Sequence, residues 1–279
     1  MSVDTIERSI TFARMAKAAY RDRGFRTQPG LAKLRHEFRF EDELTDTQGF
    51  AATWNNEVVI AFRGTEKSFA DWLGTNAQVG FVRNPWGDGH MHTGFRRAAD
   101  SVYQKLKFFV RHHRSEDSRV FLCGHSLGAA LAVITAVRMS NDSQMPDARG
   151  VFTYGSPRVG DAVFAEEYRR LGLHDRTTAW VTKDDPVSHV PPFAFCYQHV
   201  TEWGLQLNPG TCSRIKLDAK SRTKTELEWI ADVPATRRLY WLARNLDDLL
   251  KAAKRKHDHH SMQRGYLPQL LALRRSLPT

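Results

Sequence analysis

The stretch FLCGHSLGAALAVI, from Phe121 to Ile134, joins a strand-like apolar run to a helix-like run through one tight corner. The corner is a G-x-S-x-G sequence over residues 124–128. In such a strand-to-helix turn the serine backbone is strained and the hydroxyl projects from the end of a sheet, while the two glycines let strand and helix approach closely. The positive end of the helix dipole favours an oxyanion there. Ser126 is therefore the candidate nucleophile.

Segments of strand and helix character alternate along the chain on both sides of this corner. Apolar residues at helical spacing predict helices over residues 5–22, 94–114, 126–140 and 161–172. Short apolar runs predict strands at 119–124, 150–155 and 177–182, and two more within 50–65. This order is typical of an α/β fold with a mainly parallel central sheet and helices on both faces.

Local signals place several ends of these elements. Asn55 and Asn56 tolerate the positive φ angles of a tight hairpin turn, so they are expected to join the two strands within 50–65. Asp161 is expected to cap the start of helix 161–172, and Gly172 to end it.

A serine nucleophile needs a base, and the base needs an acid that orients it. In α/β-hydrolase sequences the order along the chain is Ser, then Asp or Glu, then His. Asp184 and Asp185 follow the predicted strand 177–182, at the carboxyl end where catalytic groups gather. His257, His259 and His260 occupy the last histidine-bearing loop. These five residues are the candidates for acid and base.

Composition excludes some classes and leaves others open. The formal net charge of +10 fits nucleic acid, an anionic lipid surface or solubility alone, but no nucleic-acid motif accompanies it, so we expect no nucleic-acid partner. Three cysteines predict neither a disulfide framework nor a metal site. No apolar run reaches the roughly 20 residues of a membrane span. Asp4 and Glu7 lie where a secretory signal would be basic, so we expect a cytoplasmic protein, although a specialised secretion route leaves no readable mark.

Five motifs together resemble the class 3, fungal-type lipases, which have an α/β-hydrolase fold. They are FRGT, GHSLGAA, YGSPRVG, DDPVSHVPP and HHSM, in this order and over most of residues 1–205 and from about 258 onward. The resemblance implies Ser126 as nucleophile, Asp185 as acid and His260 as base. It also implies an oxyanion hole from Thr65 and from the Leu127 N–H, with no cofactor and no metal.

The resemblance further implies a mobile lid after FRGT. It aligns with SFADWLGTN, where Phe69, Trp72 and Leu73 are expected to face an apolar substrate. Two features depart from the family. Tyr266 lies six residues after His260, where family members often have an aromatic residue at five, which keeps His259 as an alternative base.

The second departure is a basic, partly helical insertion at about 212–257 within what we expect to be a single catalytic domain over 1–279. Residues 235–256 carry a leucine stripe with a basic remainder. This pattern predicts a helix that either packs on the domain with a solvated basic face or lies on an anionic lipid surface. The sequence leaves the oligomeric state open.

His125 and Cys123 are expected to have structural roles. His125 is expected to support the corner with its side chain directed away from the site, and Cys123 to fill space at the end of a buried strand. His189 is expected either to line the pocket or to fix its loop. His90 and His92 are expected at the pocket rim or in the core, without metal.

The expected function is ester hydrolysis through an acyl-enzyme, with triacylglycerol or another acylglycerol as substrate. Phospholipase A1 and short-chain esterase are alternatives within the same chemistry. A lipase-like domain that only binds lipid or protein is the alternative outside it, but here every motif position is filled.

Overall fold

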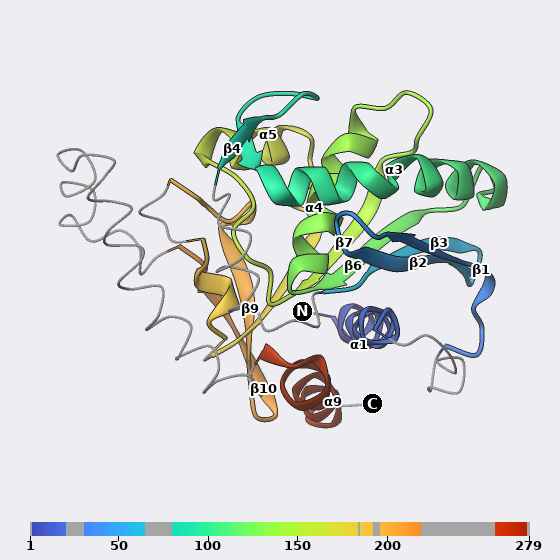
Figure 1. Cartoon of the computed structure of the whole chain (residues 1–279). Coiled ribbons are helices and arrows are strands. Elements are labelled where there is room, and N and C mark those ends of the chain that lie inside the picture. The colour runs from blue at the N-terminus through green and yellow to red at the C-terminus, as the bar shows by residue number, and fades with distance from the viewer. Residues whose placement is uncertain are drawn as a thin grey trace, which may run out of the picture.

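The computed structural model describes residues 2–20, 31–64, 80–183, 185–191, 196–218 and 260–277. Its centre is an eight-stranded sheet in the order β1-β2-β3-β6-β7-β8-β9-β10 (Figure 1). The strands from β3 to β9 are parallel, and β1, β2 and β10 add antiparallel pairs at the two edges. The prediction of an α/β fold with a mainly parallel sheet is confirmed. The strands are β1 (Arg35–Asp42), β2 (Thr47–Trp54), β3 (Glu57–Phe62), β6 (Val120–His125), β7 (Ala148–Tyr154), β8 (Thr177–Thr182), β9 (Trp203–Asn208) and β10 (Thr211–Lys216).

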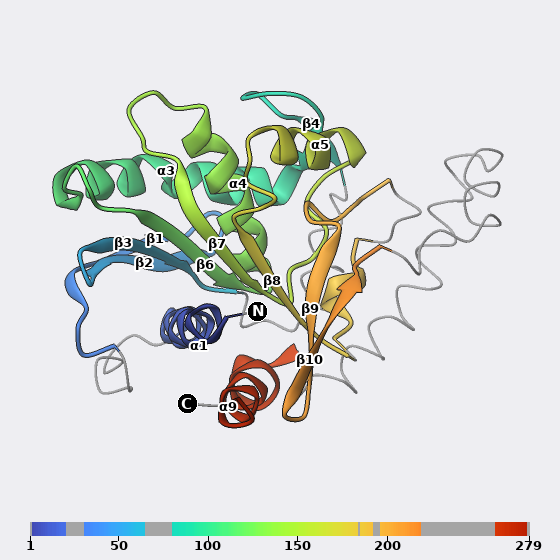
Figure 2. The same ribbon diagram turned by 180° about the vertical axis from the view of Figure 1, so that it is seen from behind.

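Helices cover both faces of the sheet, as Figures 1 and 2 show from opposite sides. One face carries α1 (Val3–Ala18) and α9 (Leu267–Arg275), which pack side by side although they come from the two ends of the chain. The other carries α3 (Thr93–His113), α4 (Leu127–Ser140) and α5 (Ala162–Arg170). A small second sheet pairs β4 (Phe81–Arg83) with β5 (His90–His92). Within the ranges given above, the helices are too short or too polar to span a bilayer.

The predicted ends of elements are confirmed where the structure describes them. Asn55 and Asn56 have φ angles of 49° and 61° and form the two-residue turn between β2 and β3. The Asp161 side chain accepts a hydrogen bond from the Phe164 N–H at the start of α5. Gly172 follows α5 with a φ of 68°, a conformation that glycine adopts without steric cost.

Alternating residues of the central strands feed two separate hydrophobic cores. In β6, Leu122 faces the core under α3 and α4, whereas Phe121 and Cys123 face the core under α1 and α9. This period of two is what a strand covered on both faces requires. Cys123 is a fully buried apolar filler, as predicted, and burial raises the pKa of its thiol.

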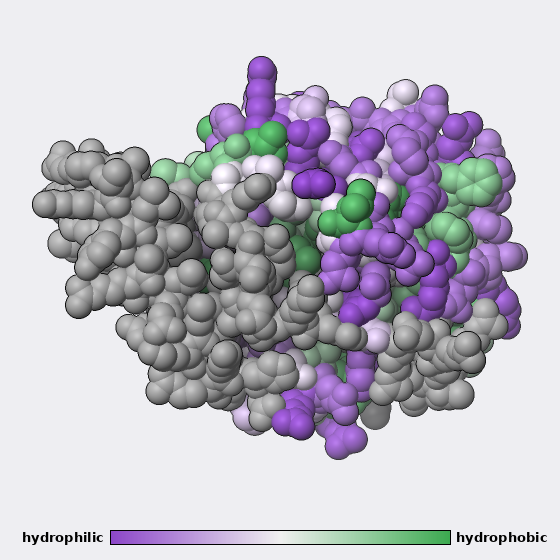
Figure 3. Space-filling model, viewed as in Figure 1, coloured by the Kyte–Doolittle hydropathy of each residue, from purple (hydrophilic) through white to green (hydrophobic). Residues whose placement is uncertain are grey.

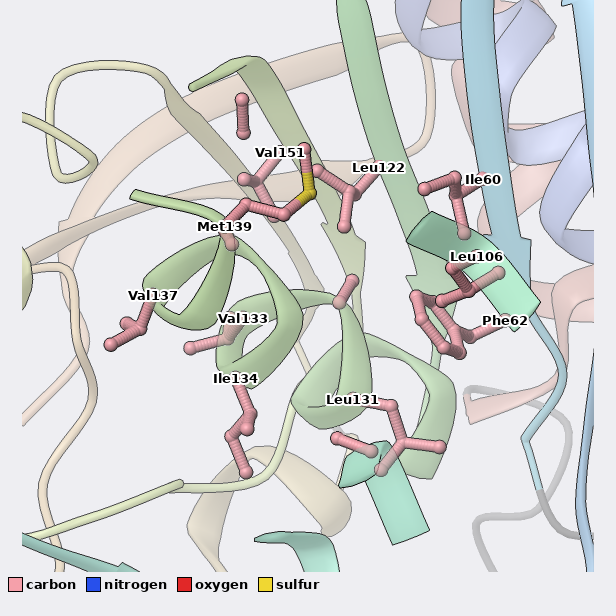
Figure 4. Packing of buried hydrophobic residues seen from close by; sticks show 14 of the residues in the cluster. Ile60, Phe62, Leu106, Leu122, Leu131, Val133, Ile134, Val137, Met139 and Val151 are labelled. Carbon is pink, nitrogen blue, oxygen red and sulfur yellow. The ribbon is translucent and has the colours of Figure 1, made fainter. Parts of the chain in front are cut away.

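The helix α4 is buried on nearly all sides because it lies between the sheet and α3. Figure 4 shows Leu131, Ile134 and their neighbours on α4 among side chains from the strands and from α3. A helix that is apolar all round is stable only in such a place. The packing holds the beginning of α4, where Ser126 lies, in a fixed position relative to the sheet.

The stretch expected to be an insertion begins with a strand of the main sheet. Residues 211–216 form β10, which pairs with β9 in antiparallel register. Its first residues therefore extend the sheet edge, because the turn at 209–210 reverses the chain beside β9. Residues 219–257 of the expected insertion, including the basic stripe of 235–256, lie outside the described residues.

The described surface is mostly hydrophilic on the face seen in Figure 3, with scattered apolar side chains. Within the described ranges, the exposed large apolar residues come from four separate segments: Leu44, Phe81, Phe108 and Val163. Single exposed apolar residues of this kind are normal on protein surfaces.

The stability of the fold is expected to fall as the pH drops from about 6.5 to about 4. His92 is buried, accepts a hydrogen bond from the Phe95 N–H at the start of α3, and has its pKa lowered by burial to about 4. In this pH window the unfolded chain binds a proton at residue 92 that the folded chain does not, so acid favours unfolding.

The variant His92→Asn keeps a capping acceptor and removes the titration. Urea unfolding at about pH 4.5 and about pH 7 should show that the variant loses roughly 2 kcal/mol less stability on acidification than the wild type. The variant is expected to be less stable at both pH values because the ring packing is lost. An equal acid-induced loss in both proteins would contradict the assignment of the effect to His92.

Candidate active site

Ser126 lies between the end of β6 and the first residue of α4, in a strained backbone conformation. Its φ and ψ angles are 58° and −128°, a region that non-glycine residues rarely adopt. Its N–H donates to the Tyr154 carbonyl on the neighbouring strand over 3.0 Å. The surrounding sheet thus holds the serine in a conformation that an isolated chain would avoid.

The two glycines of the corner are required by close backbone contacts. A Cβ on Gly124 would overlap the Gly128 carbonyl group and lie 2.6 Å from the Ala129 nitrogen. A Cβ on Gly128 would lie 2.5 Å from the Phe62 carbonyl oxygen on β3. Only glycine at both positions lets α4 start this close to β3 and β6.

Asp185 follows the carboxyl end of β8, just as Ser126 follows the carboxyl end of the parallel strand β6. The Asp185 side chain is fully buried. Its Oδ2 accepts from His260 Nδ1 over 2.9 Å and from the Tyr266 hydroxyl over 2.5 Å, and its Oδ1 accepts from the Val187 N–H over 2.8 Å. Burial alone raises the pKa of Asp185, but the interactions with His260, Tyr266 and Val187 outweigh it, and the net shift is downward. The group is therefore a carboxylate at neutral pH.

The bond to Asp185 determines which nitrogen of His260 can act as a base. A carboxylate only accepts hydrogen bonds, so Nδ1 carries the proton. In the neutral ring, Nε2 is then left with a lone pair that can accept a proton. Of the three residues expected from the sequence, Asp185 and His260 are hydrogen-bonded to each other, and Ser126 directly follows His125, whose ring packs on that of His260 at a centroid distance of 4.5 Å.

Gly155 is a functional position that the sequence did not single out. A Cβ there would overlap Asp185 Oδ2, lie 2.8 Å from the Tyr266 hydroxyl and lie 3.0 Å from His260 Nδ1. Its φ of 60° also favours glycine. The signal was present in YGSPRVG, but only the contacts show what the glycine makes room for.

Tyr266 is the second functional residue that the sequence did not assign. Besides donating to Asp185, its oxygen accepts from the Thr182 N–H over 3.2 Å. Residues Met262–Tyr266 form a π-helix, in which the Tyr266 N–H bonds to the Ser261 carbonyl five residues earlier. Because a π-helical turn holds more residues than an α-helical turn, Tyr266 reaches the acid although it lies six residues after His260.

Arg158 holds the loop that carries Asp185 through hydrogen bonds to its backbone. This side chain is almost fully buried and bonds to Asp218 Oδ1 over 2.9 Å. It also donates to the carbonyl oxygens of His189 and Pro191. His189 is exposed, and any residue at this position could offer the same carbonyl to Arg158, so the role expected for the histidine stays a prediction.

His199 adds a second support to the same loop. Its Nε2 donates to the Ser188 carbonyl over 2.7 Å, and the Ser188 hydroxyl donates to the Asp185 carbonyl over 2.9 Å. Burial lowers the pKa of His199 to about 4, so the ring is neutral at neutral pH. Sequence reasoning missed this residue because no motif contains it.

Leu127, His125 and the expected residues that the structure does not describe complete the comparison with the sequence predictions. Leu127 is the first residue of α4, so its N–H has no partner within the helix and is available to an oxyanion. The expectation for His125 is wrong in one respect, because its side chain contacts His260 instead of pointing away. Several expected residues lie outside the described ones: Thr65, Phe69, Trp72, Leu73, Asp184, His257 and His259.

His90 and His92 lie on β5 of the second sheet, and each has a structural partner on or next to a neighbouring helix. His90 Nδ1 lies 3.0 Å from Asp161 Oδ2, and the His92 ring stacks on Phe95. Across the described part of the chain, no three His, Cys, Asp or Glu side chains are arranged to hold a metal ion.

Residues 59–195 match the family model described as lipase (class 3). The secreted mono- and diacylglycerol lipase A of Penicillium cyclopium is 32% identical over 188 residues, which are 63% of this chain and 58% of that protein. A lipase of Rhizomucor miehei is 30% identical over 176 residues, 60% of this chain and 48% of that protein. The chain spans about half the length of the curated relatives it matches.

Solved structures show the same fold. A fungal lipase in complex with an inhibitor, described as a model for interfacial activation, has a TM-score of 0.65 at 19% identity and covers 77% of this chain and 86% of that one. A triacylglycerol lipase whose catalytic centre is described as a serine protease triad has a TM-score of 0.64 at 21% identity, covering 75% and 83%.

The variant Gly155→Ala is expected to separate Asp185 from His260. Its methyl group would enter the space of the Asp185–His260 hydrogen bond, and its φ of 60° would be strained. We expect kcat for ester hydrolysis to fall by about 100-fold or more, since a displacement of about 1 Å costs that much. Gly210→Ala is the matched control, because Gly210 has a similar φ of 71° but open space around its Cβ position. Equal activity in both variants would contradict this role of Gly155.

The variant Tyr266→Phe is expected to leave Asp185 in place but with one hydrogen-bond donor fewer. It deletes the hydroxyl that donates to Asp185 and leaves the Thr182 N–H without that acceptor. A hydrogen bond to a charged group contributes about 1.5–3 kcal/mol, so we expect kcat/KM to fall by roughly tenfold or more and the protein to unfold more easily. Steady-state kinetics and thermal unfolding check both effects, and an unchanged kcat/KM would contradict the first.

Proposed function

We propose that the chain belongs to the class 3 lipase family, whose model matches residues 59–195, and that it is a serine carboxylic-ester hydrolase that acts on lipid esters. One observation carries the proposal. The proton-bearing Nδ1 of His260 lies 2.9 Å from the buried carboxylate of Asp185, at the sheet edge where Ser126 occupies its strained turn. A serine hydrolase needs an acid that orients a base and a base placed near a serine nucleophile.

In the first half of the reaction, His260 Nε2 takes the hydroxyl proton of Ser126 while the serine oxygen forms a bond to the ester carbonyl carbon. The carbonyl π electrons move to its oxygen and give a tetrahedral oxyanion. When this intermediate collapses, the bond to the alcohol oxygen breaks, and the alcohol leaves with the proton from His260. The acyl group remains on Ser126.

In the second half, water replaces the alcohol. His260 takes a proton from water as the water oxygen attacks the acyl carbon, and the proton returns to Ser126 as the carboxylic acid leaves. Asp185 keeps the ring in one tautomer and stabilises the imidazolium in both halves. The Leu127 N–H at the beginning of α4 is the proposed oxyanion donor within the described residues, and the Thr65 N–H is the proposed second donor.

We propose an acylglycerol as the substrate. The names of the relatives support this choice, since they include mono- and diacylglycerol lipases. The formal net charge of +10 adds an attraction to anionic lipid surfaces. This attraction would serve a phospholipase A1 equally well, so it does not distinguish the two substrates.

The variant Ser126→Ala is expected to abolish hydrolysis in a folded protein. Initial rates on p-nitrophenyl esters from acetate to palmitate, below and above the concentration at which each ester aggregates, should fall by about a thousandfold or more against wild type. The same fold is expected because alanine keeps the N–H that bonds to Tyr154.

The wild-type profile distinguishes the candidate functions. A rate that rises with chain length and jumps at the interface supports an acylglycerol lipase, and mixed vesicles of diacylglycerol and phospholipid then separate it from a phospholipase A1. A maximum at acetate or butyrate without a jump supports a short-chain esterase. No rate above that of Ser126→Ala on any ester would leave a lipid- or protein-binding domain and refute the proposal.

A further inference from the structure

We propose that His125 is a positioning residue that holds the catalytic histidine in register with the nucleophile. The inference rests on the proposed function and deepens it. His125 is the last residue of β6 and directly precedes Ser126. The family match and the proposed reaction steps give it no role.

Both ring nitrogens of His125 have partners, and together they determine its tautomer. Nε2 lies 2.5 Å from the backbone carbonyl oxygen of His260, which can only accept, so Nε2 carries the proton. Nδ1 lies 2.8 Å from the hydroxyl of Tyr20 and accepts its hydrogen when the ring is neutral. His125 is buried, and its neutral ring with the proton on Nε2 satisfies both of these partners.

The His125 ring also packs against the side chain that it anchors. The ring centroids of His125 and His260 are 4.5 Å apart with an interplanar angle of 31°. On another side, the Tyr266 ring meets His125 edge to face at 5.9 Å. His260 is thus fixed at three places: its Nδ1 by Asp185, its carbonyl by His125, and its ring by the face of His125.

The anchoring links parts of the chain that are far apart in sequence. His125 and His260 are separated by 135 positions, and His260 directly follows residues that lie outside the described ones. Because His125 is covalently joined to Ser126, its bond to His260 places the base relative to the nucleophile. Rate enhancement depends on this placement, since a shift of about 1 Å can cost about 100-fold.

Tyr20 and Gly64 complete the arrangement on the other side of the ring. Tyr20 lies two residues beyond α1, and a Cβ on Gly64 would overlap its hydroxyl and lie 2.7 Å from the His125 carbonyl oxygen. The missing side chain at Gly64 therefore gives the Tyr20 hydroxyl access to His125. Gly64 thus leaves space for the Tyr20 hydroxyl beside His125, and Gly155 leaves space for the hydrogen bond between Asp185 and His260.

The test separates positioning from ordinary structural support. His125→Phe keeps a ring but removes both nitrogens. His125→Gln restores an N–H at the same number of bonds from Cβ as Nε2. His112→Phe is the matched control, because His112 is an exposed histidine on α3. Kinetics on the best p-nitrophenyl ester would be combined with proton NMR of the His260 Nδ1–H, whose signal is strongly shifted by its bond to the Asp185 carboxylate.

We expect His125→Phe to lower kcat by about 10- to 100-fold with KM within about twofold, and to shift or broaden the Nδ1–H signal. His125→Gln should recover most of both, and His112→Phe should match wild type. A folded His125→Phe with wild-type kcat and an unchanged signal would overturn the proposal, as would a loss in which kcat and signal merely follow the folded fraction.

Two measurements hold if His125→Phe does not fold. In wild type, the ¹⁵N spectrum of labelled histidine should show His125 as the neutral tautomer with its proton on Nε2, and a proton on Nδ1 alone would overturn the proposal. Tyr20→Phe should shift the Nδ1–H signal of His260 and lower kcat by a smaller factor than His125→Phe, whereas no change in either would also count against it. If wild type shows no esterase activity but gives the expected NMR signals, the proposed function is refuted and the positioning role of His125 is not.

Discussion

The buried carboxylate of Asp185 is the group on which the rest of the candidate active site depends. A charge removed from water is tolerated only when partners satisfy it, and here His260, Tyr266 and the Val187 N–H do so. Each partner imposes a further requirement. Tyr266 must reach the acid across a π-helical turn, and position 155 must lack a side chain. The carboxylate thereby connects three parts of the chain: the segment after β7 with Gly155, the segment after β8, and the segment from His260 to Tyr266.

The strained turn at Ser126 depends on a second constraint, which is the rigidity of its surroundings. The sheet holds its N–H through Tyr154, and the buried helix α4 fixes the chain on the carboxyl side of the turn. Strain of this kind persists only where the structure around it over-determines the backbone. The two constraints meet at His260, which Asp185 holds through a ring nitrogen and His125 holds through the backbone carbonyl.

Much of the fold could be predicted from the sequence because its signals are local. The G-x-S-x-G corner, the Asn55–Asn56 turn and the Asp161 cap each depend on a few neighbouring residues, and the structure has them where they were expected. The direction of His125 was wrong, because its neighbours along the chain say nothing about the carbonyl of His260. Likewise, β10 has a polar sequence and gains its strand form from pairing with β9 at the sheet edge.

The sequence by itself determined the alternation of strands and helices, the corner that carries the candidate nucleophile, and the candidates for acid and base. Which candidates meet was decided only by the tertiary structure. Asp185 and His260 are 75 positions apart, and their bond exists because parallel strands end at one edge and α9 packs beside α1. Residues such as Gly155, Tyr266 and His199 acquire their roles there too. Their function lies in the space and the hydrogen bonds they give to distant groups, and no local pattern records these.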